Sequence, residues 1–425
     1  MDIYKSIKNL LSGSIFTCML LTLSLLAGAQ SKIEFKGRIL DSKTNQPLPF
    51  VSIGIHKSGT GIISNEFGEF NYHVPENFEY DKIQISTIGY KKIQINASEL
   101  RSGVLITIKL EPEIQLLNEF TVWAIPAEDI VRKAIRNIHK NYPKSKTLFY
   151  GYYRDYISPI KTNNYKNLIE AALVIEDKGF NSNDFFRTKV KLEQLRYNPG
   201  ITIDSSFNQA YGGRNKYIPN TDMTAANELS ILRAHNPIRN HDLWTFSFVD
   251  IFDEQFVINH NFQYESITQV DSEKVYCINF EKDTHAGIPS NEYRVDGQIF
   301  IHSKSFAILK FTYTVTCTTP SYTGKFFDLK LEYKNINDKY YLNYLSLINY
   351  FEFNNNPLAV SLSKNAEPFF QYRELYVNKI VTWRFESLKR NETIDKNSSL
   401  IKNRVPLQEG FWESYNYTSN LKLLE

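Results

Sequence analysis

Residues 293–314 read YRVDGQIFIHSKSFAILKFTYT, and this stretch decides the fold of most of the chain. Apolar and polar residues alternate in it, so that Leu309 and Phe311 fall on one face while Lys310 and Thr312 fall on the other. A period of two residues is typical of a strand that buries one face. The segments VDG and HSKS interrupt the apolar runs and predict turns. We therefore expect consecutive antiparallel strands here.

Strand-like runs of the same kind follow one another from residue 147 onward. The segments DSEK and NINDK separate further pairs of runs, as in hairpins. A long meander with one apolar face must be covered or rolled up. We therefore predict a large curved antiparallel sheet, built from TLFYGYYRDYI (147–157), KNLIEAALVIED (166–177), FFRTKVKLEQL (185–195), WTFSFVDIF (244–252), FQYESITQV (262–270), KVYCINFEK (274–282), EYRVDGQIFIH (292–302), FAILKFTYTVT (306–316), FFDLKLEYK (326–334), YYLNYLSLINYFEF (340–353), QYRELYVNKI (371–380) and VTWRFESL (381–388).

One or two helices are expected to cover this sheet. A proline begins an amphipathic segment over residues 126–141, in which Ile130 and Ala134 belong to one apolar stripe. The segment TAANELSILRAH (224–235) predicts a second, short helix within residues 199–243, which interrupt the strands. This second helix would either seal the core or act as a lid over a ligand.

The first 29 residues have the features of a cleaved secretory signal. Two lysines form a basic start, residues 15–26 are almost wholly apolar, and small residues end the segment at Ala29. Cleavage there leaves Gln30 or Ser31 as the new terminus. An uncleaved membrane anchor is the alternative, because about 18 apolar residues suffice to span a bilayer.

The cysteines leave one question open. Thr17, which precedes Cys18, lacks the small side chain that a lipidation signal requires, so we expect no lipid there. Cys277 and Cys317 remain in the mature chain, both in strand-like runs. They would form a disulfide if their strands were neighbours, or else pack as two buried apolar side chains. No further thiol or histidine is spaced to complete a metal site with them.

Composition excludes several classes of protein. The 425 residues include 29 Phe, 27 Tyr and 4 Trp but only 18 Gly and 15 Pro, which excludes a disordered or collagen-like chain. The formal net charge is +3, and such a balanced surface gives no reason to expect a nucleic-acid partner.

A smaller β-domain is predicted for residues 33–115. Polar clusters such as DSKTNQP and SNEFG separate its alternating runs. Turns at intervals of roughly 8–12 residues are typical of an antiparallel sandwich, here with six or seven strands. The runs are IEFKGRIL (33–40), PFVSIGIH (49–56), EFNYHV (69–74), KIQIST (82–87), KKIQIN (91–96) and VLITIKL (104–110).

This domain resembles the carboxypeptidase-regulatory-like β-sandwich, which also precedes the plug in TonB-dependent receptors of Gram-negative outer membranes. The resemblance implies an accessory module without catalytic residues. The segment LLNEFTVWA (116–124) is similar to the connection to the plug, but the residues from 125 to 425 are too few for a plug and a 22-stranded barrel. The matching positions are Gly37, Asp41, Pro47, Leu48, Val51, Gly59, Gly61, Ser64, Asn65, Gly68, Phe70, Ser86, Gly89 and Tyr90.

The later strands resemble, in pattern, the curved half-barrels of periplasmic lipoprotein carriers. That resemblance implies a concave apolar face, partly covered by helices, which holds acyl chains or another hydrophobic ligand.

Residues that could carry out chemistry are few. His73 and Glu76 have the H-x-x-E spacing of zinc carboxypeptidases, but nothing else in the domain completes a zinc site. His235, His241 and Asp242 form the densest cluster of possible metal ligands or acid-base groups. A separation of six residues suits neither a helical nor a strand pair, so we expect loop histidines there.

Asp250, Asp253 and Glu254 could pair as the carboxylates of a glycosidase, although acidic residues at a strand end are usually solvated. The sequence contains no G-x-S-x-G, P-loop, H-E-x-x-H or EF-hand motif. We therefore predict no catalytic residue, no cofactor and no metal site.

These observations predict a mainly β chain in four parts: a signal peptide (1–29), a sandwich (30–115), a linker (116–125) and a helix with a large sheet (126–425). The aromatic segment PLQEGFWESYN (406–416) is expected to dock back on the sheet.

The function expected of this chain is binding or scaffolding in the cell envelope, without catalysis. We expect an exported protein in the periplasm or on the periplasmic face of the outer membrane. The sandwich (residues 30–115) would contact an envelope protein or a glycan, and the large sheet would hold a lipid or another hydrophobic ligand. A small outer-membrane β-barrel with a periplasmic sandwich and an unrecognised hydrolase are the alternatives.

Overall fold

The structure is a computed structural model. The residues whose placement it describes are 33–78, 80–100, 103–116, 125–160, 166–182, 188–198, 228–241, 248–270, 273–285, 292–319, 322–351, 369–395 and 398–417. The predicted signal peptide therefore lies outside the described residues.

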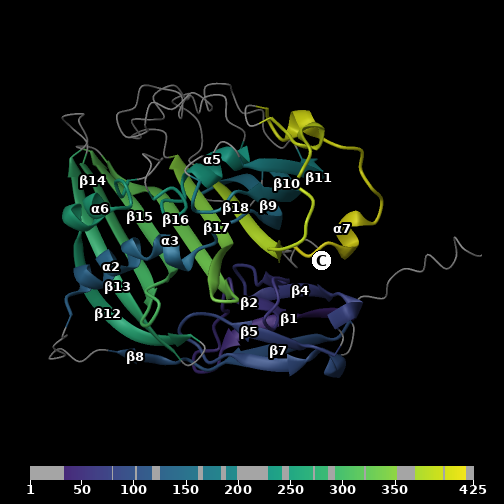
Figure 1. Cartoon of the computed structure of the whole chain (residues 1–425), viewed down its shortest axis with the longest axis horizontal. Helices are drawn as coiled ribbons and strands as arrows, with labels where there is room; N and C mark the ends of the chain where they lie inside the picture. Colours follow the sequence, from purple (N-terminus) through teal and green to yellow (C-terminus); the bar gives the residue numbers. More distant parts are fainter. Residues whose placement is uncertain are drawn as a thin grey trace, which may run out of the picture.

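The N-terminal domain is a β-sandwich, as predicted (Figure 1). One sheet has the order β4-β1-β7 and the other the order β3-β2-β5-β6. Strands β1 and β7 pair in parallel, and the other pairs in the two sheets are antiparallel. The strands are β1 (Ile33–Asp41), β2 (Ser52–Ile55), β3 (Gly61–Ile63), β4 (Glu69–Val74), β5 (Lys82–Ser86), β6 (Ile93–Asn96) and β7 (Leu105–Leu110).

The rest of the chain builds one large antiparallel sheet, also as predicted. Within the described residues it has eleven strands, in the order β11-β10-β9-β18-β17-β16-β15-β14-β13-β12-β8. The strands are β8 (Ile114–Leu116), β9 (Thr147–Pro159), β10 (Lys166–Asp177), β11 (Lys189–Asn198), β12 (Asn261–Val270), β13 (Glu273–His285), β14 (Glu292–His302), β15 (Ile308–Thr319), β16 (Tyr322–Ile336), β17 (Lys339–Phe351) and β18 (Phe369–Val381).

The sheet is open. In the described part of the chain, β11 pairs with β10 alone and β8 pairs with β12 alone, so the two end strands do not meet. A closed sheet, which one of the alternative predictions required, is therefore not the arrangement found. Among the described residues, no helix is long and apolar enough to cross a membrane.

Several local predictions are confirmed by the strands and turns. Leu309, Phe311 and Tyr313 are buried, whereas Lys310 and Thr312 are only partly buried. The segment HSKS forms the turn between β14 and β15. In NINDK, both central residues of the turn between β16 and β17 have positive φ, 50° and 61°, as a two-residue type I′ hairpin requires.

The VDG segment is not a turn, contrary to the prediction. Gly297 lies inside β14, opposite Phe280 and Tyr313. A Cβ atom at this glycine would lie 2.2 Å from the Phe280 ring and 2.5 Å from the Thr312 carbonyl oxygen. The glycine therefore allows a close approach within the strand instead of a change of direction.

Two predicted strands are also wrong. The described part of the 244–252 segment forms turns that lead into a helix, because Asp253 caps that helix by accepting a hydrogen bond from the Gln255 amide at 2.7 Å. The 381–388 segment leaves the sheet after its first residue, and Arg384 adopts a positive φ of 50° that a regular strand does not allow.

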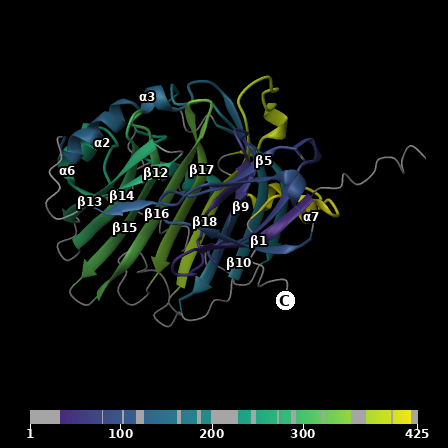
Figure 2. The ribbon, with the colours of Figure 1, turned by 90° about the horizontal axis from the view of Figure 1, so that it is seen from below.

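Helices cover one face of the large sheet (Figure 2). The predicted helix over 126–141 is confirmed, with a break at Asn137. Phe252 and Phe256 pack on Phe311 of the sheet, with ring centroids 5.3 Å and 6.1 Å apart. We call this the helix face. The helices are α2 (Ala127–Arg136), α3 (Ile138–Asn141), α5 (Glu228–Ala234) and α6 (Glu254–Asn259).

The sandwich packs on the opposite face, which we call the sandwich face. Tyr344 and Tyr376 project from the large sheet into the sandwich core, and Phe50 lies 5.1 Å from the Tyr344 ring. At Gly59 the two domains come so close that an added Cβ would lie 2.6 Å from the carbonyl oxygen of Ile380. Two side chains of the large sheet therefore belong to the core of the sandwich.

The C-terminal segment docks on the same face, as predicted. Trp412 of α7 (Phe411–Ser414) packs on Tyr152, and the Arg196 guanidinium lies 4.3 Å from the Trp412 ring. The Asn416 side chain bonds to both main-chain groups of His73, at 2.8 Å and 3.1 Å. This segment thereby ties the sandwich to the sheet.

Cys277 and Cys317 are both buried and free, so the structure excludes the disulfide. Their neighbours on β14 are Phe300 and Tyr293, seven residues apart. At roughly 3.3 Å per residue, the two thiols are about 23 Å apart along the strands.

One buried histidine at the end of α6 should make stability depend on pH. His260 is 6% exposed, and its Nδ1 donates to the Phe256 carbonyl oxygen at 2.8 Å. Burial lowers the pKa of His260 from 6.5 to about 4. Between pH 6.5 and about 4, His260 is protonated in the unfolded chain and neutral in the folded chain. The free energy of unfolding therefore falls as the pH is lowered through this window.

We expect this histidine to cost on the order of 2–3 kcal/mol of unfolding free energy between pH 7 and pH 4. Urea unfolding at several pH values gives the unfolding free energy of the mature chain and of His260→Gln. The contribution of His260 is the difference between the two slopes of unfolding free energy against pH. The matched control is His139→Gln, which removes an exposed histidine from α3. Equal slopes for His260→Gln and the unaltered chain would contradict the assignment.

Candidate functional site

A row of polar side chains crosses the sandwich face of the large sheet from β12 to β11. Each member lies directly opposite the next on the neighbouring strand. Cross-strand neighbours on one face are close enough to interact. From β12 to β11 the row is Gln263, Asn279, Gln298, Thr312, Lys330, Ser346, Glu374, Arg154, Glu170 and Arg196.

The centre of this row is a buried ion pair. Arg154 Nε lies 2.7 Å from Glu374 Oε1, and the two side chains are only 7% and 1% exposed. The Tyr344 and Tyr372 hydroxyls donate to Glu374 at 2.9 Å and 3.1 Å. Burial lowers the pKa of Arg154, but the Glu374 charge and the neighbouring Tyr152, Tyr156 and Tyr372 together outweigh burial and hold that pKa above its ordinary value. Arg154 therefore keeps its positive charge.

A second buried pair lies on the helix face of the same two strands. Arg373 Nε lies 3.0 Å from Asp155 Oδ2, and Gln371 donates to Asp155 Oδ1 at 2.9 Å. The Tyr153 hydroxyl also donates to Asp155, at 3.2 Å. Adjacent residues of β9 thus pair with adjacent residues of β18 on opposite faces of the sheet.

A groove lies over the β12–β17 part of the polar row. Its volume is about 940 Å³, within the usual range for ligand sites. The sandwich residue Phe50 forms one wall, and the sheet supplies the floor. Polar floor residues from five successive strands are Gln263, Asn279, Gln298, Thr312 and Asp328.

The Phe50 wall is held in a strained backbone conformation. Its φ is +59°, which is rare for a large side chain. The Phe50 amide donates to the Ser64 carbonyl oxygen at 3.1 Å, and its ring lies 3.9 Å from Lys330 Nζ. Lys330 is partly buried beneath it, and burial lowers the pKa of this lysine to about 8. An aromatic ring from the sandwich and a weakly basic amine from the large sheet thus lie together beside the groove.

The carboxylates of the groove have cationic neighbours. Arg294 donates to Asp296 at 3.0 Å and to Glu281 at 3.1 Å. Lys325 lies 3.3 Å from Asp328. The charges of the groove are therefore largely balanced within it.

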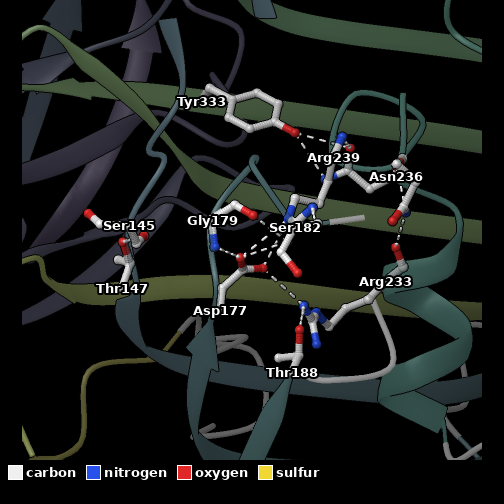
Figure 3. A network of polar contacts seen from close by, with 11 residues as sticks. Ser145, Thr147, Asp177, Gly179, Ser182, Thr188, Arg233, Asn236, Arg239 and Tyr333 are labelled. Carbon is white, nitrogen blue, oxygen red and sulfur yellow. Dashed lines mark hydrogen bonds and ion pairs between the residues drawn. The ribbon is translucent and has the colours of Figure 1, made fainter. Parts of the chain in front are cut away.

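The helix face has a different site (Figure 3). Asp177, at the end of β10, accepts from Arg239 Nε at 3.1 Å and from Arg233 Nη2 at 3.2 Å. The two arginines also bond to Gly179 and Thr188, which are neighbours of β10 and β11. Burial lowers the pKa of Arg233 to about 10, while the two arginines together hold the pKa of Asp177 below its ordinary value against the effect of burial.

The cavity beside this network is small. Asp177, Arg233 and Tyr333 line it together with apolar side chains such as Leu345 and Leu375. Its volume is about 40 Å³, enough for one to three water molecules but not for an acyl chain. In the described part of the helix face, aromatic packing fills the space that the carrier resemblance assigned to a hydrophobic ligand.

The histidines singled out from the sequence do not converge. His235 packs against Phe327 and His241 stacks on Phe180, with centroids 5.4 Å and 6.4 Å apart. Asp242 lies outside the described residues. His73 lies in β4, and Glu76 begins the next turn.

The acidic residues near 250 have structural partners. Asp250 pairs with Lys282 and accepts from Asn259 at 2.9 Å. Asp253 caps α6, and Glu254 accepts from Arg132 Nε at 2.8 Å. The residues that the structure describes contain no group of three or more His, Cys, Asp or Glu side chains placed to hold a metal ion.

Sequence reasoning missed the polar row and both buried ion pairs. The predicted strands contained their members, but apolar alternation says nothing about polar residues on the opposite face. One signal was available in the sequence, which has RD at 154–155 and RE at 373–374. When the two strands run antiparallel, each arginine lies opposite the acidic residue of the other pair, so their charges are complementary.

Comparison with known proteins supports the N-terminal domain. Residues 35–122 match the CarboxypepD_reg-like domain family, which confirms the resemblance of the sandwich. Comparison with curated proteins found no match for the chain.

Three crystal structures are similar to the chain. A protein domain from Vibrio parahaemolyticus, named for outer membrane lipoprotein sorting, is 10% identical, with 63% of this chain and 96% of that chain covered and a TM-score of 0.25. A DUF1329 family protein from Desulfovibrio piger is 10% identical, with 62% and 95% covered and a TM-score of 0.24. A membrane-associated protein of unknown function from Bacteroides fragilis is 9% identical, with 83% and 97% covered and a TM-score of 0.16.

The Arg154–Glu374 pair should dominate the stability of the sheet. Glu374→Gln leaves Arg154 buried without its counter-charge, so we expect a loss of roughly 3–5 kcal/mol in the unfolding free energy. Urea unfolding of the mature chain measures the loss. The double variant Arg154→Met, Glu374→Leu should recover most of it, because no buried charge then remains.

The matched control is Glu281→Gln, whose side chain is 54% exposed in its pair with Arg294. Exposed pairs contribute at most about 1 kcal/mol, so this variant should be nearly neutral. Similar losses for Glu374→Gln and Glu281→Gln would show that the buried pair has no special role.

Proposed function

We propose that this chain is an exported, non-enzymatic binding protein that holds a polar ligand in the groove between its sandwich and its large sheet. The groove carries this proposal: its volume is about 940 Å³, and its floor presents amide and hydroxyl groups from successive strands. The strained Phe50 supports it, since strained backbone tends to gather at binding sites.

The location we propose is the periplasm or the periplasmic face of the outer membrane. The secretory signal predicted for residues 1–29 supports export, and residues 35–122 form a module of a kind that also occurs in outer-membrane receptors. Contact of the sandwich with an envelope protein remains a prediction, as does a lipid on the helix face. A lipid would have to displace part of the packed aromatic core.

Export has a direct test. Sequencing the N-terminus of the protein recovered from the periplasmic fraction of an expressing Gram-negative cell should give Gln30 or Ser31. Substituting Ala29→Arg should leave the longer precursor, because the peptidase needs a small residue there. A protein that starts at Met1 and stays in the cytoplasm would contradict the proposal.

Occupation of the groove can be followed with a fluorescent reporter. Asn261 is exposed at the rim of the groove, so Asn261→Cys offers an accessible thiol for an environment-sensitive dye. Labelling should be selective, because burial raises the pKa of Cys277 to about 12 and also raises the pKa of Cys317. We expect a saturable fluorescence change with at least one class among neutral oligosaccharides, uncharged peptides and nucleosides.

The matched control is Asn198→Cys, which carries the same dye at the exposed end of β11, far from the groove. It should give no response to the same compounds. A response of Asn261→Cys to palmitate alone, or to none of the compounds, would rule out a polar ligand in the groove.

A further inference from the structure

The floor of the groove offers neutral hydrogen-bonding groups at regular intervals. Gln263, Asn279, Gln298 and Thr312 lie opposite one another on β12, β13, β14 and β15. Adjacent strands are about 4.8 Å apart, so these four side chains span about 14 Å. Amides and hydroxyls both donate and accept hydrogen bonds. A ligand that lies across the strands can therefore bond to each of them in turn.

The charge balance of the groove favours an uncharged ligand. Three carboxylates and two lysines line it, and Arg294 neutralises two of the carboxylates from beside it. The lining therefore has no cluster of one sign that would attract a polyanion or a polycation.

The position of the groove argues against an extended peptide. A peptide usually binds by adding a strand at a sheet edge, where main-chain groups are unpaired. Most of the groove lies on the face of β13–β17, and each of these strands is paired on both sides, whereas β12 pairs with β8 only at Ser266–Thr268. Over β13–β17, side chains and not main-chain groups are therefore offered to the ligand.

The apolar part of the lining includes Ile348 and Tyr372 of the large sheet and Phe50 of the sandwich. Phe262, Phe280, Tyr313 and Leu329 reach the groove from strands on which they pack into the helix-face core. Phe50 is the aromatic ring that the sandwich adds, at one end of the neutral row. These apolar groups beside several amides and hydroxyls match a ligand with many hydroxyl groups and small apolar patches.

We infer that the groove binds a neutral oligosaccharide, which lies across β12–β15 and bonds to the neutral side chains of the polar row. This inference rests on the proposed function, because it names the ligand class of the same groove. The sugar hydroxyls pair with Gln263, Asn279, Gln298 and Thr312, and Phe50 packs against the apolar face of a ring at the end of the chain.

Fluorescence anisotropy with labelled, uncharged oligomers of glucose, mannose and N-acetylglucosamine tests the inference on the mature chain. We expect at least one series to bind, with affinity that rises with length up to about four sugars. Because the contacts are uncharged, raising the ionic strength about tenfold should change the Kd by less than about twofold. The double variant Gln263→Leu, Thr312→Val should weaken binding roughly tenfold or more.

The matched control is Thr316→Val, which makes the same change on the same strand and face as Thr312→Val but outside the groove. Its Kd should be unchanged, and thermal unfolding should show that all variants remain folded. An equal loss in Thr316→Val would overturn the location of the ligand.

Binding of uncharged peptides in place of oligosaccharides, weakened by Thr312→Val, would overturn the glycan inference and leave the proposed binding function standing. Binding only to sulfated or uronic oligomers, lost in high salt, would overturn it in the same way. If no oligosaccharide binds and the fluorescence of the labelled Asn261→Cys variant changes with none of the compounds, the inference and the proposed function are overturned together.

Discussion

The pairing of β9 with β18 is the constraint on which the large sheet depends. In the sheet order this is the pair that joins the meander β9–β11 to the meander β12–β18, and it connects residues more than 200 positions apart. A slip of one residue would place two like charges opposite each other, Asp155 with Glu374 or Arg154 with Arg373, and would leave the other two charges opposite uncharged side chains. One register places Arg154 opposite Glu374 and Asp155 opposite Arg373. Every other register is less stable, because it leaves buried charges unpaired. Charge complementarity thus specifies a contact that hydrophobic alternation alone leaves ambiguous.

The same charges explain why the two halves of the sandwich face differ. The half that carries Arg154 and Glu374 must be kept from water for the pair to be fully effective. The sandwich covers it by packing on Tyr344 and Tyr376, and the C-terminal segment covers it by packing Trp412 on Tyr152. The half over β12–β15 carries amides and hydroxyls, which are stable in water and need no cover. Phe50 is the sandwich residue at the border of this half, and the groove lies beside it.

Much of the fold could be predicted because strand alternation and hairpin turns are local signals. The long strands, the helix over 126–141 and the Asn337-Asp338 turn follow from such signals. The errors arose where a local signal was ambiguous: Gly297 serves packing and not a turn, and the 248–252 segment leads into a capped helix. The candidate site could not be predicted, because it depends on which strands become neighbours. Gln263 and Thr312 are ordinary surface residues in the sequence and become one row only through the register of four strands.

The aromatic content of the chain favours a filled helix face over an open one. Phe252, Phe256, Phe280 and Phe311 pack with centroids 4.6–6.1 Å apart, distances at which aromatic rings attract one another. Opening a cavity for an acyl chain would break several of these contacts and expose the rings, whereas the groove on the other face is already formed. A ligand that enters the groove pays no such cost, and its affinity can come entirely from the polar groups that the β-strands hold in place. The sandwich face of β12–β15, whose opposite face packs in the core, is for this reason the surface best placed to bind a ligand.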